Sequence, residues 1–265
     1  MNGSISRIYA LVLRHIHIWR SSVMRLVDSI YWPAVQMVMW GFMTQFLLPQ
    51  SSFVAQAAGV LLSGLLLWEV VVRGNLSLSI AFLEEMWSRN LGHLFVSPIR
   101  SWEMATGIII TALLRTLLGL IPVSLMAWAF FGFSIYSLGV PLIAFFLILQ
   151  MFSWSIGLAM SGMIMRVGQS AESFAWAAVF ILMPISGVYY PISVLPHWLQ
   201  PFAYILPTSY VFEGMRSILL QKAVLWHLLG FAFALSVVYL VVGFQIFLWF
   251  FRASRRAGSL LSQGE

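Results

Sequence analysis

The chain has 265 residues, of which 61% are hydrophobic and only 8% are charged, with a net charge of +6 and no cysteine. A water-soluble domain of this length carries about 25% charged residues, and the absence of cysteine excludes disulfide bonds and thiolate chemistry. The composition therefore indicates an integral membrane protein. We expect one membrane domain, residues 1–265, because no segment between the apolar runs is long enough to form a second, soluble core.

Residues 5–23 have the pattern of an amphipathic helix rather than of a membrane span. Arg7, Arg14 and Arg20 alternate with apolar residues that recur every three or four positions, which is typical of a helix in the membrane interface. A cytosolic helix packed on a partner has the same pattern, and both interpretations stay open. The expected apolar face comprises Ile5, Ile8, Val12, Ile16, Trp19 and Val23.

Six apolar runs follow, and each is long enough to cross a bilayer core of about 30 Å at about 1.5 Å per residue. Because the first of them begins only near residue 28 and is of full length, we expect no cleavable signal peptide. The fourth run contains small residues that allow two helices to approach closely, within the chain or between two copies. These are Ser153, Gly157, Ser161 and Gly162. The predicted spans are 28–48, 57–82, 104–132, 138–164, 173–190 and 226–251.

The basic residues outside the spans predict the orientation. Ten of them fall on the side of the two termini, whereas the opposite side has only Arg216 and Lys222. Cytoplasmic loops are enriched in Lys and Arg, so both termini are predicted to be cytoplasmic. The same rule explains the net positive charge, and no nucleic-acid partner is needed to account for it.

The cytoplasmic segment from Phe82 to Glu103 contains three of the eight acidic residues and two arginines. Its apolar residues keep helical spacing until Pro98, because proline disfavours helix at the residue before it. We therefore expect a short amphipathic helix, which either covers the bundle or forms a docking surface. The apolar residues are Leu83, Met86, Trp87, Leu91, Leu94 and Phe95.

The segment from Pro184 to Arg216 is rich in proline, aromatic and aliphatic residues. Five of the ten prolines lie between Pro184 and Pro207, and each proline interrupts a continuous helix. Unpaired backbone groups cannot face lipid. The segment is therefore predicted to form short helices that re-enter the outer leaflet, as an outer gate or a lipid-contact element.

Three charged residues fall inside predicted spans, where ionisable groups usually face the bundle interior. Glu69 and Arg73 are four residues apart and share one helix face, and Arg115 lies at a similar predicted depth on the next span. We expect Glu69 to pair with Arg115, Arg73 or both, and so to hold spans two and three in register. The alternative is a transport path that accepts an anionic headgroup.

No catalytic motif occurs in the chain. The sequences G-x-x-x-x-G-K-[S/T], H-E-x-x-H and G-x-S-x-G are absent, and the five histidines show no metal-ligand spacing. We therefore expect no metal site, no nucleotide-binding loop and no enzymatic activity in this chain.

The arrangement resembles the permease subunits of ABC-2 type exporters over nearly the whole chain. The six-span layout with its amphipathic N-terminal helix carries part of this resemblance. The segment after span two is similar to the family's coupling helix, through Glu84, Glu85, Arg89, Asn90, Leu91, Phe95 and Pro98. The segment between the last two spans is similar to the family's re-entrant gate, through Tyr189, Tyr190, Pro191, Pro196, Trp198, Pro207, Glu213 and Arg216.

The resemblance implies half of a transporter in a bacterial inner membrane. Two permeases, expected to be a homodimer, would pair around a path, and each would dock one of two separate ATP-binding subunits, which hold ATP and Mg²⁺. The implied cargo is an amphipathic, lipid-like, glycan or drug-like molecule that leaves the cytoplasm or the inner leaflet. The alternatives are an ATP-independent channel or secondary transporter, or a membrane scaffold. Against the former, the two halves show no inverted repeat and no matched broken helices.

Overall fold

The computed structural model describes residues 3–21, 23–47, 52–87, 99–168 and 172–257, and these segments form an all-helical bundle. The first half contributes α1 (Gly3–Arg20), α2 (Val23–Leu47), α3 (Ser52–Trp87) and α5 (Ser101–Phe131). The second half contributes η2 (Ile135–Leu138), α6 (Val140–Val167), α7 (Glu172–Ile185), η4 (Ile192–Val194), α8 (Gln200–Ile205), α9 (Pro207–Arg216), η5 (Ser217–Gln221) and α10 (Trp226–Ala257).

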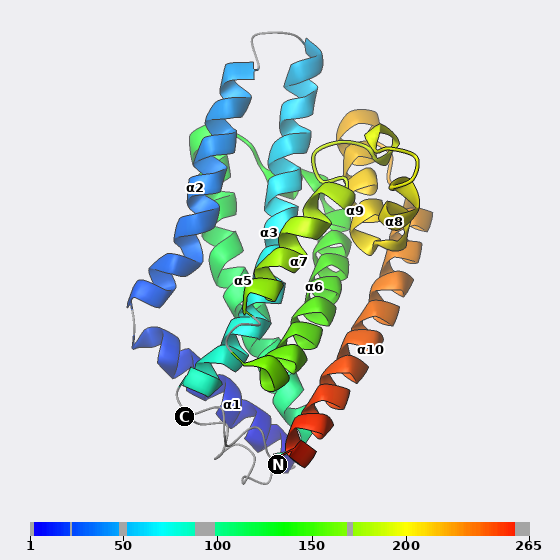
Figure 1. Cartoon of the computed structure of the whole chain (residues 1–265). Helices are drawn as coiled ribbons and strands as arrows, with labels where there is room; N and C mark the ends of the chain where they lie inside the picture. The colour runs from blue at the N-terminus through cyan, green and yellow to red at the C-terminus, as the bar shows by residue number, and fades with distance from the viewer. Residues whose placement is uncertain (1–2, 22, 48–51, 88–98, 169–171, 258–265) are drawn as a thin grey trace.

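Helix α3 lies at the centre of the bundle and contacts α2, α5, α6, α7 and α9 (Figure 1). Of its most apolar stretch, 83% is buried inside the protein, against 39% for α5 and 22% for α10. Helix α1 lies at one end of the bundle, whereas α8 and α9 lie at the other end beside α10 (Figure 1). The centre of the fold is therefore a helix that has almost no surface left for lipid.

Among the described residues, four helices are long and apolar enough to cross a membrane. They are Gly59–Glu84, Trp102–Phe131, Val140–Arg166 and Trp226–Ser254. The predicted span 28–48 corresponds to α2, and the predicted span 173–190 corresponds to α7, which has only 14 residues. Helix α7 ends at Ile185 because the chain turns there, through buried Ser186 and through Gly187 at positive φ. The expected count of six spans is thus not confirmed.

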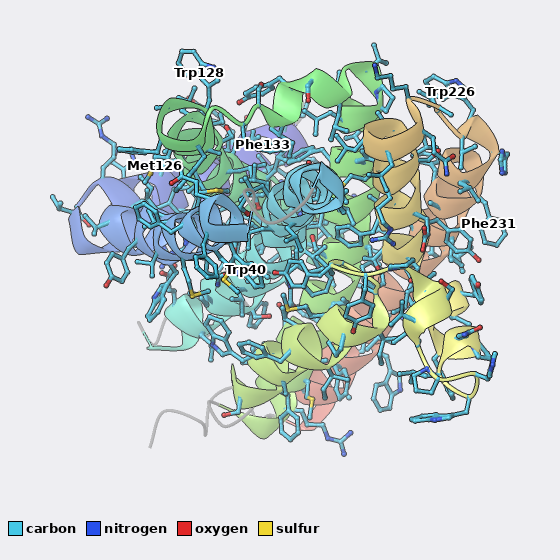
Figure 2. All side chains as sticks on the ribbon, turned by 90° about the horizontal axis from the view of Figure 1, so that it is seen from above. Trp40, Met126, Trp128, Phe133, Trp226 and Phe231 are labelled. Carbon is cyan, nitrogen blue, oxygen red and sulfur yellow. The ribbon has the colours of Figure 1, made fainter. Side chains whose placement is uncertain are left out.

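Exposed tryptophans mark the two ends of the spanning helices. On α5, Trp102 and Trp128 are 26 residues apart, which corresponds to ~39 Å along the helix. On α10, Trp226 and Trp249 are separated by ~35 Å. All four side chains are exposed, and in the end-on view Trp128, Trp226 and Phe231 lie at the periphery while Trp40 and Phe133 lie nearer the middle (Figure 2). These spacings suit interfacial tryptophans on a bilayer about 40 Å thick with its headgroups.

Helix α1 runs along the first half of α5 in the same direction. Three contacts share one sequence offset of 96 residues: Arg7 with Glu103, Leu11 with Gly107 and Trp19 with Arg115. A constant offset over twelve residues requires two helices that rise together. The amphipathic helix therefore packs within this chain.

The buried face of α1 differs from the predicted one. It comprises Leu11, Val12, His15 and Trp19, whereas Ile5 is 58% exposed and Val23 already belongs to α2, at 73% exposure. Gly107 lets α5 come so close that the stripe Leu11–His15–Trp19, one residue every four, becomes the contact face.

The small residues of α6 serve packing inside the chain. Gly157 faces Leu78 of α3, and Ser161 donates a hydrogen bond to the Leu78 carbonyl at 3.3 Å. Gly162 faces Phe250 of α10. In return, Gly243 of α10 lies directly against the backbone of Ser155. Of the two interpretations of these small residues, the structure favours packing within the chain.

We expect Gly243→Ala to destabilise the protein by about 1–3 kcal/mol, because the added Cβ would overlap the Ser155 backbone, which cannot move aside without shifting α6. The measurement is the midpoint of thermal unfolding in detergent, followed by tryptophan fluorescence. Gly230→Ala is the matched control on the same helix, where nothing lies within 4 Å of the added atom. Equal midpoints for the two variants would contradict the close approach of α6 and α10.

Candidate functional site

The candidate coupling segment begins where α3 ends. Phe82–Trp87, predicted to start a separate amphipathic helix, form the last turns of α3, and Phe82 and Leu83 are fully buried there. Glu84 lies in the same turns, while for Glu85 only the backbone is described. The other predicted coupling residues lie outside the described residues: Arg89, Asn90, Leu91, Phe95 and Pro98.

Glu84 pairs with Arg115 of α5, with 3.6 Å between Oε1 and Nη2. The guanidinium carbon of Arg115 also lies 5.3 Å from the centre of the Trp19 ring of α1, in cation–π geometry. Both charged side chains are largely shielded, at 9% and 13% exposure. This cluster therefore joins α1, α3 and α5 within one turn of the end of α3.

The predicted pair between Glu69 and Arg115 is wrong. Glu69 and Glu84 are fifteen residues apart on one continuous helix, which places them ~22 Å apart along its axis. Arg115 cannot reach both, and it contacts Glu84. Depth counted from the predicted span boundaries places Arg115 level with Glu69, whereas in the structure Arg115 lies level with the last turns of α3.

A second ion pair fixes the other end of α1. Arg7 donates to Glu103 through Nε at 2.8 Å and through Nη2 at 2.6 Å, in a two-point geometry. Glu103 is completely buried and also accepts a hydrogen bond from the backbone N–H of Arg100 at 3.0 Å, which caps the first turn of α5. Sequence reasoning missed this pair. The one sequence feature that indicated this pair was Glu103 itself, an isolated acidic residue in the first turn of an apolar helix, three residues after Arg100.

The candidate gate at the opposite end is held by Glu213 and Arg216 of α9. Arg216, 7% exposed, donates to the Gly187 carbonyl at 2.7 Å and lies 3.0 Å from Glu213. Glu213 also accepts the backbone N–H of Ile192 at 3.0 Å. Two side chains one helical turn apart therefore hold both ends of the connection between α7 and η4.

The remaining predicted gate residues fall into two groups. Tyr190 donates to the Pro184 carbonyl at 2.7 Å, and Pro207 is buried at the start of α9, where its missing N–H leaves no donor unpaired. By contrast, Pro191, Pro196 and Trp198 are exposed, Trp198 to 71%. The proline-rich segment thus has one side packed on the bundle and one side turned outward.

Tyr189 connects the candidate gate to the central helix. Its ring stacks on Trp40 of α2, with centroids 5.0 Å apart, and the adjacent Val188 carbonyl lies against Gly64 of α3. The Tyr189 ring and the adjacent backbone therefore pack on α2 and α3.

Glu69 and Arg73 form an ion pair along α3, with 3.4 Å between Oε2 and Nε. Glu69 is 4% exposed and Arg73 is 14% exposed at its side chain. The spacing of four residues predicted this pair. It lies within the most buried span, beneath the connection that carries Tyr189, and among the described residues no group of three metal-ligating side chains occurs there or elsewhere.

We expect Arg7→Met to lower the thermal midpoint in detergent clearly, because it leaves the carboxylate of Glu103 without its cation. The double variant Arg7→Met/Glu103→Gln should recover part of the loss. Arg20→Met removes an exposed cation from the same helix and serves as the control. A double variant that is as unstable as the sum of the two single changes argues against direct coupling.

We expect Arg216→Lys to accelerate amide hydrogen exchange in residues 186–195, since a lysine cannot reach the Gly187 carbonyl and both oxygens of Glu213 together. The readout is exchange mass spectrometry of peptides from this segment. The control is Lys222→Met, which removes an exposed cation beyond η5. Unchanged exchange in Arg216→Lys would show that other contacts hold the connection.

The family model described as ABC-2 type transporter matches residues 8–220. A search of curated proteins finds no match to this chain.

Proposed function

The chain belongs to the ABC-2 type transporter family, and on this premise we propose that it is the permease half of an ATP-driven exporter. As a member, it is a multi-pass membrane component of the transporter and a transport subunit without catalysis of its own. The proposal adds two permease copies, expected to be identical, and two separate ATP-binding subunits that supply ATP and Mg²⁺. It also takes residues 1–265 as a single membrane domain with no nucleotide-binding domain.

One observation carries the coupling proposal: α1, α3 and α5 are joined by charged side chains at the point where α3 ends. Residues 88–98 follow directly, and the pair Glu84–Arg115 lies within the last turn before them. A displacement of this segment by a docked ATP-binding subunit would act on α3 through the backbone. It would act on α5 and α1 through Arg115 and Trp19. Three helices would then move together.

The proposed topology places this end in the cytoplasm. Arg7, Arg166 and Arg252 all lie near helix ends on this side of the bundle, as the contact of Ser254 with Met165 and the pairing of α1 with the start of α5 indicate. An excess of basic residues is characteristic of cytoplasmic ends. Helices α2 and α7 would complete six spans, with both termini inside a bacterial inner membrane.

The proposed gate is the connection held by Glu213 and Arg216. Outward opening requires this segment to leave α3. The contacts that resist it include Arg216 to Gly187, Glu213 to Ile192, Val188 on Gly64 and Tyr189 on Trp40. The Glu69–Arg73 pair lies directly beneath. We assign it a structural role in α3, and we propose an amphipathic or lipid-like cargo because the surrounding surfaces are largely hydrocarbon.

The experiment that tests the function is purification of the tagged chain in mild detergent, followed by identification of co-purifying proteins. A nucleotide-hydrolysing subunit in a two-to-two ratio with the permease supports the proposal. Purification of the chain alone, or only with proteins that lack a nucleotide-binding loop, would falsify the coupling argument and favour a channel or a scaffold.

We expect Glu84→Gln to reduce cargo-stimulated ATPase activity of the assembled complex several-fold, because the ion pair with Arg115 is lost while the docking surface stays in place. Partner binding, measured by co-purification, should be unchanged. Glu85→Gln and Arg89→Gln probe the docking segment itself and should weaken partner binding. The charge swap Glu84→Arg/Arg115→Glu should restore part of the activity, and a swap no better than either single change speaks against the pair.

A further inference from the structure

Helices α5 and α6 diverge and leave a cavity of about 220 Å³ between them. They scarcely touch each other, although both pack on the central helix α3. The floor of the cavity is formed by Leu66, Leu67 and Val70 of α3, none of which is more than 1% exposed. The short helix η2 lies over one end, where the chain passes from α5 to α6.

The residues that line the cavity favour a hydrocarbon as its occupant. Among the described residues that line the cavity, the polar side chains are Ser124 and Tyr136. Their hydroxyls bond to each other at 2.8 Å, and Ser124 can also donate to the Ile121 carbonyl at 2.8 Å. A water molecule needs two to four polar partners, and an apolar cavity of about 150 Å³ remains dry and takes up benzene. This larger cavity therefore favours an apolar occupant over water.

The mouth of the cavity is continuous with the lipid-facing surface of the protein. Ile121 and Ile143, which line it, are 49% and 63% exposed. Exposed apolar side chains flank them along both helices, including Leu118 and Leu147. Because α5 and α6 are long and apolar enough to span a membrane, the opening faces acyl chains.

We propose that this cavity is a binding site for one acyl chain of a membrane lipid. The acyl chain would enter between Ile121 and Ile143 and lie on α3. The glycerol and ester groups of the lipid would then lie near the half-exposed Tyr136, at the η2 end of the cavity. The volume is below the roughly 300–1,000 Å³ of sites for drug-sized molecules, so it suits one chain rather than a whole cargo. The bound acyl chain fills the gap between α5 and α6, and this role does not depend on which cargo the transporter exports.

The test uses the purified protein in nanodiscs that contain phosphatidylethanolamine with a photoreactive diazirine in one acyl chain. After irradiation, labelled peptides are mapped by mass spectrometry. We expect labelling around Leu117–Ile121 and Ile143–Phe146 to exceed severalfold the labelling of the exposed α10 residues Val238, Val241 and Val242, which report ordinary surrounding lipid.

Ile121→Trp places a large ring across the mouth and should reduce labelling of the α6 peptide to the level of α10. Leu118→Trp is the matched control, since Leu118 is 46% exposed on the same helix and does not line the cavity. Thermal midpoints establish that both variants are folded. Labelling equal to that of α10 in the unmodified protein overturns the proposal. Cross-links from these peptides to a second copy of the chain also overturn it, because they identify the face as an interface between permeases.

Discussion

The enclosure of α3 is the constraint on which the rest of this structure depends. A helix surrounded by α2, α5, α6, α7 and α9 has little surface for lipid or water, so each charge on it needs a partner inside the protein. Glu69 is paired along the helix itself with Arg73, and Glu84 is paired across to Arg115 of α5. The second pair also joins α3 to α5.

Helices α1, α3 and α5 pack together at one end of the molecule. The first turns of α5 share an apolar cluster with Phe82 of α3. Helix α1 packs along the same stretch of α5, anchored by Arg7 on the buried Glu103 and by Trp19 on Arg115. The amphipathic helix α1 is thereby a part of the bundle, attached to α5 at two points.

The opposite end of the molecule, at the connection between α7 and η4, also packs on α3, but through different contacts. There the chain turns after α7 and packs backbone on backbone, with Val188 against Gly64, while Arg216 and Glu213 hold the turn from α9. Tyr189, in this turn, stacks on Trp40 of α2. Glu84 and Gly64 thus lie on one continuous helix, α3, which connects the two ends of the molecule. The α5–α6 gap, in contrast, lies on the lipid side, where hydrocarbon can take the place of protein.

The sequence by itself determined the class of protein, the helical spans with high apolar content and the proline-rich connection, because composition and short spacings are local quantities. It also named Arg73 as one of two possible partners of Glu69, and the structure shows this pair. The sequence predicted the family from the same local motifs. Only the tertiary structure decided the partner of Arg115, the pair Arg7–Glu103 and the buried face of α1, since each depends on how far one helix is shifted along another, and a shift of a few residues changes every contact. The cavity between α5 and α6 is likewise absent from any single helix pattern, because it arises from the divergence of two helices that pack on a third.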